Sequence, residues 1–235
     1  MLYLAERGYR VIAFDRRGHG RSDQPWSGYL YDQFADDLRD LIEQLGLSGV
    51  TLVGHSIGGG EIARYVRRHG TKRVRKMVFV SSATPRMLKT DVNPGGLPIA
   101  MFDHLRSELV QDRAQFYWQL SVPYFGYNLA DRQLGQALRR QFLRIGLQSS
   151  VKAALDCMAG FFQEDFTSDM QSIDVPSLFL HGQDDQIVPV QNSSVLSSEI
   201  VREAMLRIVC DGSHGLPITH SNVVNQELLT FLQKA

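Results

Sequence analysis

Short runs of apolar, mostly β-branched residues alternate along this chain with longer segments whose apolar positions recur every three or four residues. Runs of the first kind are typical of buried strands, and segments of the second kind are typical of helices with one apolar face. The five predicted strands are residues 10–15, 50–54, 75–81, 177–181 and 205–210. This alternation predicts an α/β fold in which helices flank a mostly parallel sheet.

The same pattern predicts the helices that flank the sheet. Asp32 precedes apolar positions spaced for one helix face, and we expect it to cap a helix that ends before Gly46. Residues 61–69 predict a second helix, which Gly70 should stop, and residues 223–233 predict the last helix of the chain. Each of these helices would pack its apolar face on the sheet.

The stretch between residues 85 and 166 interrupts the alternation. It follows the third predicted strand, holds no convincing strand of its own, and has helical patterns at 114–120, 132–147 and 151–162. We therefore predict a helical cap over residues 85–166, inserted into a core made of residues 1–84 and 167–235. Its many aromatic side chains fit two interpretations, an apolar core of the cap itself or the lining of a pocket beneath it.

Residues 54–58 (GHSIG) carry the sharpest chemical signal, because they lie between a predicted strand and a predicted helix. A nucleophilic serine needs a tight turn between strand and helix to expose its hydroxyl, and flanking glycines permit that strained backbone. Ser56 is therefore the candidate nucleophile. The helix that follows would offer the backbone N–H of Ile57 to a developing oxyanion. The alternative interpretation is a glycine-rich turn with an idle serine.

A serine hydroxyl needs a neighbouring imidazole to take its proton, and a carboxylate must orient that imidazole. His214 lies on a glycine-flanked loop just after the last predicted strand, whereas the other six histidines fall in helices, turns or strand ends. Asp184 and Asp185 follow the fourth predicted strand, and we prefer Asp185, leaving Asp184 as the alternative. Ser56, Asp185 and His214 would then all lie at carboxyl ends of strands, where open α/β sheets bind ligands.

Composition narrows the function classes. The 235 residues include 25 basic and 25 acidic side chains, and this balance argues against nucleic acid or an anionic membrane as a partner. The two cysteines, Cys157 and Cys210, are too few for a disulfide framework, which favours a reducing, cytoplasmic location. No signal peptide or membrane-spanning run is evident. Metal-ligand spacings, a phosphate loop and a dinucleotide fingerprint are also missing, so we expect no cofactor.

Taken together, these motifs resemble those of the α/β-hydrolases, and more narrowly those of the bacterial cofactor-free chloroperoxidases and aryl esterases, also called perhydrolases. The resemblance spans nearly the whole chain. It is carried by residues 7–22 (RGYRVIAFDRRGHGRS), 54–60 (GHSIGGG), 165–166 (DF), 181–189 (HGQDDQIVP) and 214–215 (HG).

The resemblance implies an α/β-hydrolase-type fold with a helical cap, and a catalytic triad of Ser56, Asp185 and His214 without haem or metal. It also implies a small acyl pocket beside the triad. The residues expected to line that substrate pocket are His55, Phe125, Phe161, Ile187 and Val188.

The sequence differs from this family's pattern at its N-terminal end. A short helical run leads directly to Gly8, whereas the family has a β-hairpin, a third strand and a loop that donates a first oxyanion N–H before that point. The resemblance therefore implies a gap between residues 10–15 and 50–54. Three outcomes are open: the two strands pair directly, another chain fills the gap in an oligomer, or the sequence is a fragment or begins at a misplaced start codon.

We predict a serine hydrolase of small aryl or alkyl esters that works through an acyl-enzyme, with hydrogen peroxide as a co-substrate in a perhydrolase side reaction. The alternative of a different class is a catalytically impaired homologue that binds a ligand or partner chain. A lactonase or carbon–carbon bond hydrolase would share the triad. Dehalogenases and epoxide hydrolases of this fold use an aspartate nucleophile, so Ser56 speaks against them.

Overall fold

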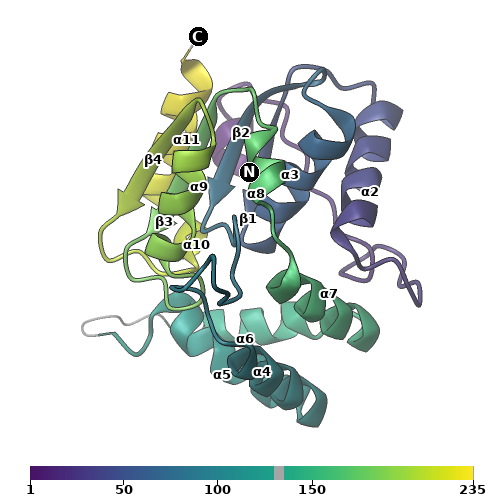
Figure 1. Ribbon diagram of the computed structural model, residues 1–235, viewed down its shortest axis with the longest axis vertical. Coiled ribbons are helices and arrows are strands. Elements are labelled where there is room, and N and C mark those ends of the chain that lie inside the picture. Colours follow the sequence, from purple (N-terminus) through teal and green to yellow (C-terminus); the bar gives the residue numbers. More distant parts are fainter. Residues whose placement is uncertain (130–134, 235) are drawn as a thin grey trace.

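The computed structural model describes residues 1–129 and 135–234, and its centre is one parallel sheet (Figure 1). Within those residues the sheet has four strands, in spatial order β1, β2, β3 and β4. The strands are β1 (Val50–His55), β2 (Val74–Val80), β3 (Ser177–Gly182) and β4 (Ala204–Val209). Every neighbouring pair is parallel, so four of the five predicted strands and the α/β class are confirmed.

The two central strands are buried almost throughout because helices cover both faces of the sheet. Along β2, Met77 and Phe79 belong to one apolar core, while Val78 and Val80 belong to the core on the opposite face. Phe79 is paired with Phe179 of β3, and their rings stack 4.6 Å apart. Alternation of side chains across the sheet thus divides one run of apolar residues between two cores.

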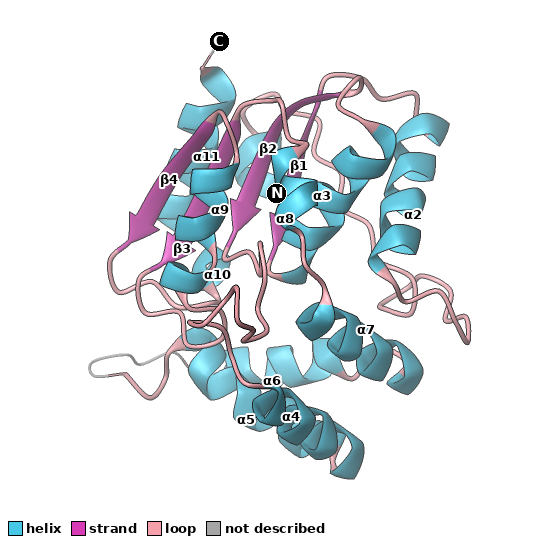
Figure 2. Ribbon diagram, viewed as in Figure 1, coloured by secondary structure: helices cyan, strands magenta, loops and turns pink. Residues whose placement is uncertain are grey.

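Helices of the core surround the sheet on both sides (Figure 2). One face is covered by α3 (Ile57–His69), with α2 (Tyr31–Gln44) packed against it, and by α8 (Thr167–Gln171) and α9 (Ser194–Ile200). The opposite face is covered by α10 (Leu216–Thr219) and α11 (Ser221–Gln233), with the short α1 (Leu2–Ala5) beside α11. A single 3₁₀ turn, η1 (Val190–Asn192), precedes α9.

Two helix starts differ from the sequence prediction. The residue that caps α2 is Leu30, and Asp32 lies in the first helical turn, where its carboxylate bonds Arg64 and Arg68. The prediction that Asp32 caps this helix is therefore wrong: two arginines on α3 attract its carboxylate away from the helix end. Helix α3 begins at Ile57 and not at residue 61, because the glycines after Ser56 continue directly into helix.

The predicted strand at 10–15 is not formed. These residues have no regular secondary structure, and β1 pairs on one side only, with β2, among the described residues. A cavity of about 1080 Å³ separates residues 9–16 from β1. A strand requires a neighbour for its ladder hydrogen bonds, and residues 10–15 lie too far from β1 to share them. Direct pairing of these two segments, one of the three outcomes expected for the gap, is therefore not what the structure shows.

Four helices lie together at the end of the sheet toward which the strand arrows point (Figure 2). They are α4 (Ile99–Gln111), α5 (Arg113–Phe125), α6 (Gln136–Gly146) and α7 (Val151–Gln163). We call α4–α7 the cap. The helices predicted at 114–120 and 151–162 are confirmed, and the one predicted at 132–147 is present from Gln136 on, with residues 132–134 outside the described residues. The exact division of the chain at residues 85 and 166 stays a prediction.

Candidate active site

A strained turn between β1 and α3 presents Ser56. Its backbone has φ 54° and ψ −119°, a left-handed conformation that is uncommon for a residue with a side chain. The turn is held because the N–H of Ser56 donates to Val80 O at 3.0 Å and its carbonyl accepts from Gly59 N at 3.0 Å. Position 54 must be glycine, since a Cβ there would lie 2.4 Å from the Gly58 carbonyl oxygen. The motif glycines thus allow the strand and the helix to meet closely at the serine.

Ser56, His214 and Asp185 form a continuous hydrogen-bonded chain. His214 Nε2 lies 3.0 Å from Ser56 Oγ, and His214 Nδ1 lies 2.8 Å from Asp185 Oδ2. Because a carboxylate only accepts, Nδ1 carries the proton and Nε2 is left to accept from the serine hydroxyl. The three residues come from the turn after β1, the loop after β3 and the loop after β4. The structure thus brings together the three residues predicted from sequence, with Asp185 and not Asp184 beside the imidazole.

Asp185 is fully buried and accepts hydrogen bonds on both oxygens. Oδ1 accepts from the backbone N–H groups of Ile187 at 2.9 Å and Val188 at 2.8 Å. Oδ2 is shared by His214 and by His181, whose Nε2 lies 3.1 Å away. Burial alone would raise the pKa of this carboxyl, but the electrostatic interaction with His214 and the hydrogen bonds from both histidines outweigh it and hold the pKa well below its usual range. Asp185 is therefore ionised at neutral pH.

His181 is a contributor to the site that the sequence did not identify as such. It is completely buried at the end of β3, and its Nε2 also lies 2.9 Å from the carbonyl of Val188 while Nδ1 lies 2.7 Å from Ser194 Oγ. A carbonyl accepts only, so Nε2 carries the proton that also faces Asp185. The available sequence signal was its position four residues before Asp185, across the turn that follows β3.

His55 and Tyr124 flank the imidazole of His214. The ring of His55 is 5.0 Å from that of His214, and the ring of Tyr124 meets His214 edge to face at 4.9 Å. Burial, with help from the neighbouring His214, lowers the pKa of His55 to about 4. Burial, with a smaller contribution from the charge of Asp185, raises the pKa of Tyr124. At neutral pH both rings are therefore uncharged.

The other predicted pocket residues lie in two groups. Phe161, Ile187 and Val188 belong to one apolar cluster that joins cap helices α4 and α7 to residues outside the cap, and Val188 in it is completely buried. Phe125 is also buried, but it packs at the end of α5 among the rings of Tyr124, Tyr127 and Phe142. Both groups lie near the triad in space, since the N–H of Val188 donates to Asp185 and the end of α5 bonds Gly215, the residue after His214. Whether they hold an acyl group stays a prediction.

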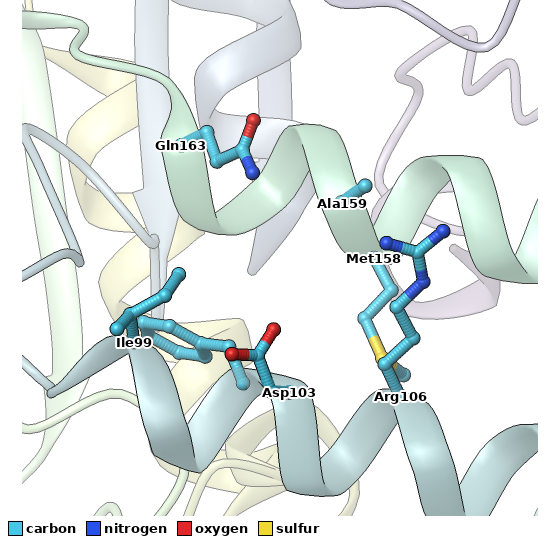
Figure 3. A pocket seen from close by; sticks show the side chains of 7 residues that line it. Ile99, Asp103, Arg106, Met158, Ala159 and Gln163 are labelled. Atoms are coloured by element: carbon cyan, nitrogen blue, oxygen red, sulfur yellow. The ribbon is translucent and has the colours of Figure 1, made fainter.

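A pocket between α4 and α7 and a cavity along the edge of β1 both lie outside the triad. The small pocket between α4 and α7 measures about 20 Å³, room for a water molecule, and Ile99, Asp103 and Arg106 face Met158 and Gln163 across it (Figure 3). The cavity of about 1080 Å³ runs along the edge of β1 and reaches His55 at one end. Ser56, Asp185 and His214 line neither of them.

Metal ligands and membrane-spanning helices also bear on the class of site. Within residues 1–129 and 135–234, no group of three or more His, Cys, Asp or Glu side chains lies close enough to hold a metal ion. In the same part of the chain, no helix is both long and apolar enough to cross a membrane.

Comparison with known proteins places these features among relatives. The family profile described as alpha/beta hydrolase fold matches residues 1–221. A non-heme haloperoxidase of Rhodococcus erythropolis is 44% identical over 234 residues, and a bifunctional esterase/perhydrolase of Acinetobacter calcoaceticus is 41% identical over 234 residues. Each alignment covers 99% of this chain and 85% of the relative. The crystal structure of a bromoperoxidase from Bacillus anthracis superposes with a TM-score of 0.96 at 38% identity, covering 99% of this chain and 85% of that one.

Proposed function

This chain belongs to the α/β-hydrolase fold family, and on that premise we propose that it is a serine carboxylesterase with perhydrolase activity. The observation that carries the proposal is the triad geometry, in which Ser56 Oγ, the two nitrogens of His214 and Asp185 Oδ2 are linked at 3.0 and 2.8 Å. The names of the relatives, which include an esterase/perhydrolase and several haloperoxidases, agree with this activity.

The geometry accounts for acylation of the enzyme by an ester. His214 Nε2 takes the proton of Ser56 as Oγ bonds to the ester carbonyl carbon, and the negative charge of ionised Asp185 stabilises the imidazolium that forms. The first N–H of α3, that of Ile57, has no carbonyl one turn earlier to bond, and it is the group we assign to the oxyanion. His214 then returns its proton to the departing alcohol, which leaves an acyl group on Ser56.

The second half of the reaction decides between two products. When His214 removes a proton from water, the hydroxide adds to the acyl carbon and a carboxylic acid leaves as Ser56 regains its proton. When hydrogen peroxide takes the place of water, the same steps release a peracid. The peracid can then oxidise a halide ion in solution, so a haloperoxidase reaction requires no metal bound to the protein.

Replacement of Ser56 by Ala tests the proposal. We expect the wild-type chain to release nitrophenol from p-nitrophenyl acetate and the variant to be slower by about a thousandfold or more. With peroxide and an alkyl acetate, oxidation of iodide to triiodide should likewise depend on Ser56. Nitrophenol release by Ser56→Ala at the wild-type rate would exclude the triad as its source.

The same assay separates the alternative of a catalytically impaired homologue. An intact, folded wild-type chain that shows no turnover of p-nitrophenyl acetate above the Ser56→Ala background would favour a binding role. A circular dichroism spectrum and a thermal melt of the same samples establish that both chains are folded.

A further inference from the structure

One peptide group connects the general base to both the sheet and the cap. It is the peptide between His214 and Gly215, at the start of α10. Its carbonyl oxygen lies 3.0 Å from His55 Nε2, and its N–H donates to Tyr124 O at 2.8 Å. Both polar groups of a single peptide plane are therefore bonded to residues far away in the sequence, one from the end of β1 and one from the end of α5.

The chemistry of each partner fixes the direction of these bonds. A carbonyl oxygen accepts only, so His55 Nε2 must carry its proton. The carbonyl of Tyr124 belongs to the last turn of α5, where helix carbonyls have no N–H partner within the helix. The ring N–H of His55 and the backbone carbonyl of Tyr124 are therefore the donor and the acceptor that hold this peptide.

We propose that His55 is a positioning residue, which holds the His214–Gly215 peptide plane and thereby aims the imidazole of His214 at Ser56. The proposal rests on the function proposed above. Rotation about the bond from the His214 Cα to its carbonyl carbon would break both hydrogen bonds of that peptide. With this torsion fixed, the Cα–Cβ bond of His214 keeps a constant direction, and Nε2 stays 3.0 Å from Ser56 Oγ.

Packing around the peptide leaves little room for an alternative orientation. His214 itself is 1% exposed, and a Cβ at position 215 would lie 2.5 Å from the ring of Phe125. His55 contacts its target through the ring as well as through Nε2, since the His55 and His214 rings are 5.0 Å apart. An experiment on His55 therefore has to separate the hydrogen bond from the ring packing.

Two replacements make that separation. His55→Phe keeps an aromatic ring against His214 but has no donor. His55→Gln has no ring, but its amide nitrogen is four bonds from Cα, as Nε2 of histidine is. The matched control is His104→Gln on α4, where the side chain is 70% exposed and bonded only loosely to Glu108 at 3.5 Å.

The measurement is kcat and KM for p-nitrophenyl acetate, with the melting temperature of every variant. We expect His55→Phe to lower kcat by about a hundredfold, the scale of a small misplacement of a catalytic group, with KM changed less than about threefold. His55→Gln should recover most of that loss, and His104→Gln should match the wild type. Amide exchange of the peptide covering residues 210–216 should be faster in His55→Phe than in His55→Gln.

Other results would overturn the assignment. Wild-type kcat in His55→Phe, a loss confined to KM, or equal losses in the Phe and Gln variants would each show that the hydrogen bond does not aim the base. If His55→Phe does not fold, His55→Asn replaces it in the comparison, because its amide is one bond too short to reach. An inactive wild-type chain would instead refute the proposed function, and the exchange measurement would still report on the peptide.

Discussion

Replacing Asp185 by Asn exchanges one carboxylate oxygen for an NH₂ group at the centre of the hydrogen-bond network. This exchange should switch His214 to its other tautomer. The Asn amide has one oxygen and one NH₂ group, and two backbone N–H groups face the present Oδ1. If the NH₂ occupied that side, two buried donors would lose their acceptor, each at a cost of about 1–3 kcal/mol. The NH₂ therefore takes the position of Oδ2, where it faces His214 Nδ1 and His181 Nε2.

An NH₂ group at this position favours the other tautomer of His214, in which Nδ1 accepts and Nε2 carries the proton. A protonated Nε2 cannot accept from Ser56, so kcat should fall by about ten thousandfold, equivalent to about 5.5 kcal/mol of barrier. The assay is p-nitrophenyl acetate hydrolysis at neutral pH, with Asp184→Asn as the neighbouring control. A kcat in Asp185→Asn within tenfold of the wild type would refute this account of the tautomer.

Two further predictions concern stability. Gly60→Ala would place a Cβ 2.5 Å from the ring of Phe166, so overpacking should lower the free energy of unfolding by about 1–3 kcal/mol. Gly135→Ala, where no atom of the described residues lies within 4 Å of the added Cβ, is the control and should leave urea denaturation unchanged. His55 has its pKa lowered from 6.5 to about 4 by burial, so the unfolded chain binds the extra proton first as the pH falls. The unfolding free energy should therefore decline from pH 6.5 to pH 4 by up to about 3 kcal/mol more in the wild type than in His55→Gln; parallel pH curves for the two proteins would contradict this.

Most of the sheet and the triad could be predicted from sequence because their signals are local. An apolar run followed by a glycine-rich turn is enough to place Ser56, and the short loops after β3 and β4 carry Asp185 and His214 to the same edge. The segment 10–15 has an equally good strand pattern, but a strand also depends on a neighbour, which no local pattern reports. Asp32 has the residue type of a helix cap, yet arginines 32 and 36 positions later in the chain determine its contacts.

The partners of His214 were harder to predict for the same reason. His55 adjoins Ser56, and the family resemblance implies that it lines the substrate pocket, but its ring nitrogen bonds a backbone carbonyl 159 positions away. Tyr124 accepts the hydrogen bond from Gly215 with its backbone carbonyl, a group that every residue has, so its residue type gives no sequence signal for this contact. Backbone acceptors of this kind can be recognised only when the path of the chain is known.

The open edge of β1 also affects how the protein behaves in concentrated solution. Among the described residues β1 is paired on one side only, and Val53 in its middle is 53% exposed. A strand edge without a partner is a template for a strand of another molecule. Since the basic and acidic side chains balance to a formal net charge of zero at pH 7, charge repulsion between copies is weakest in a neutral buffer. We therefore expect the purified chain to self-associate through β1 when it is concentrated near neutral pH, and Val53→Lys should reduce that association.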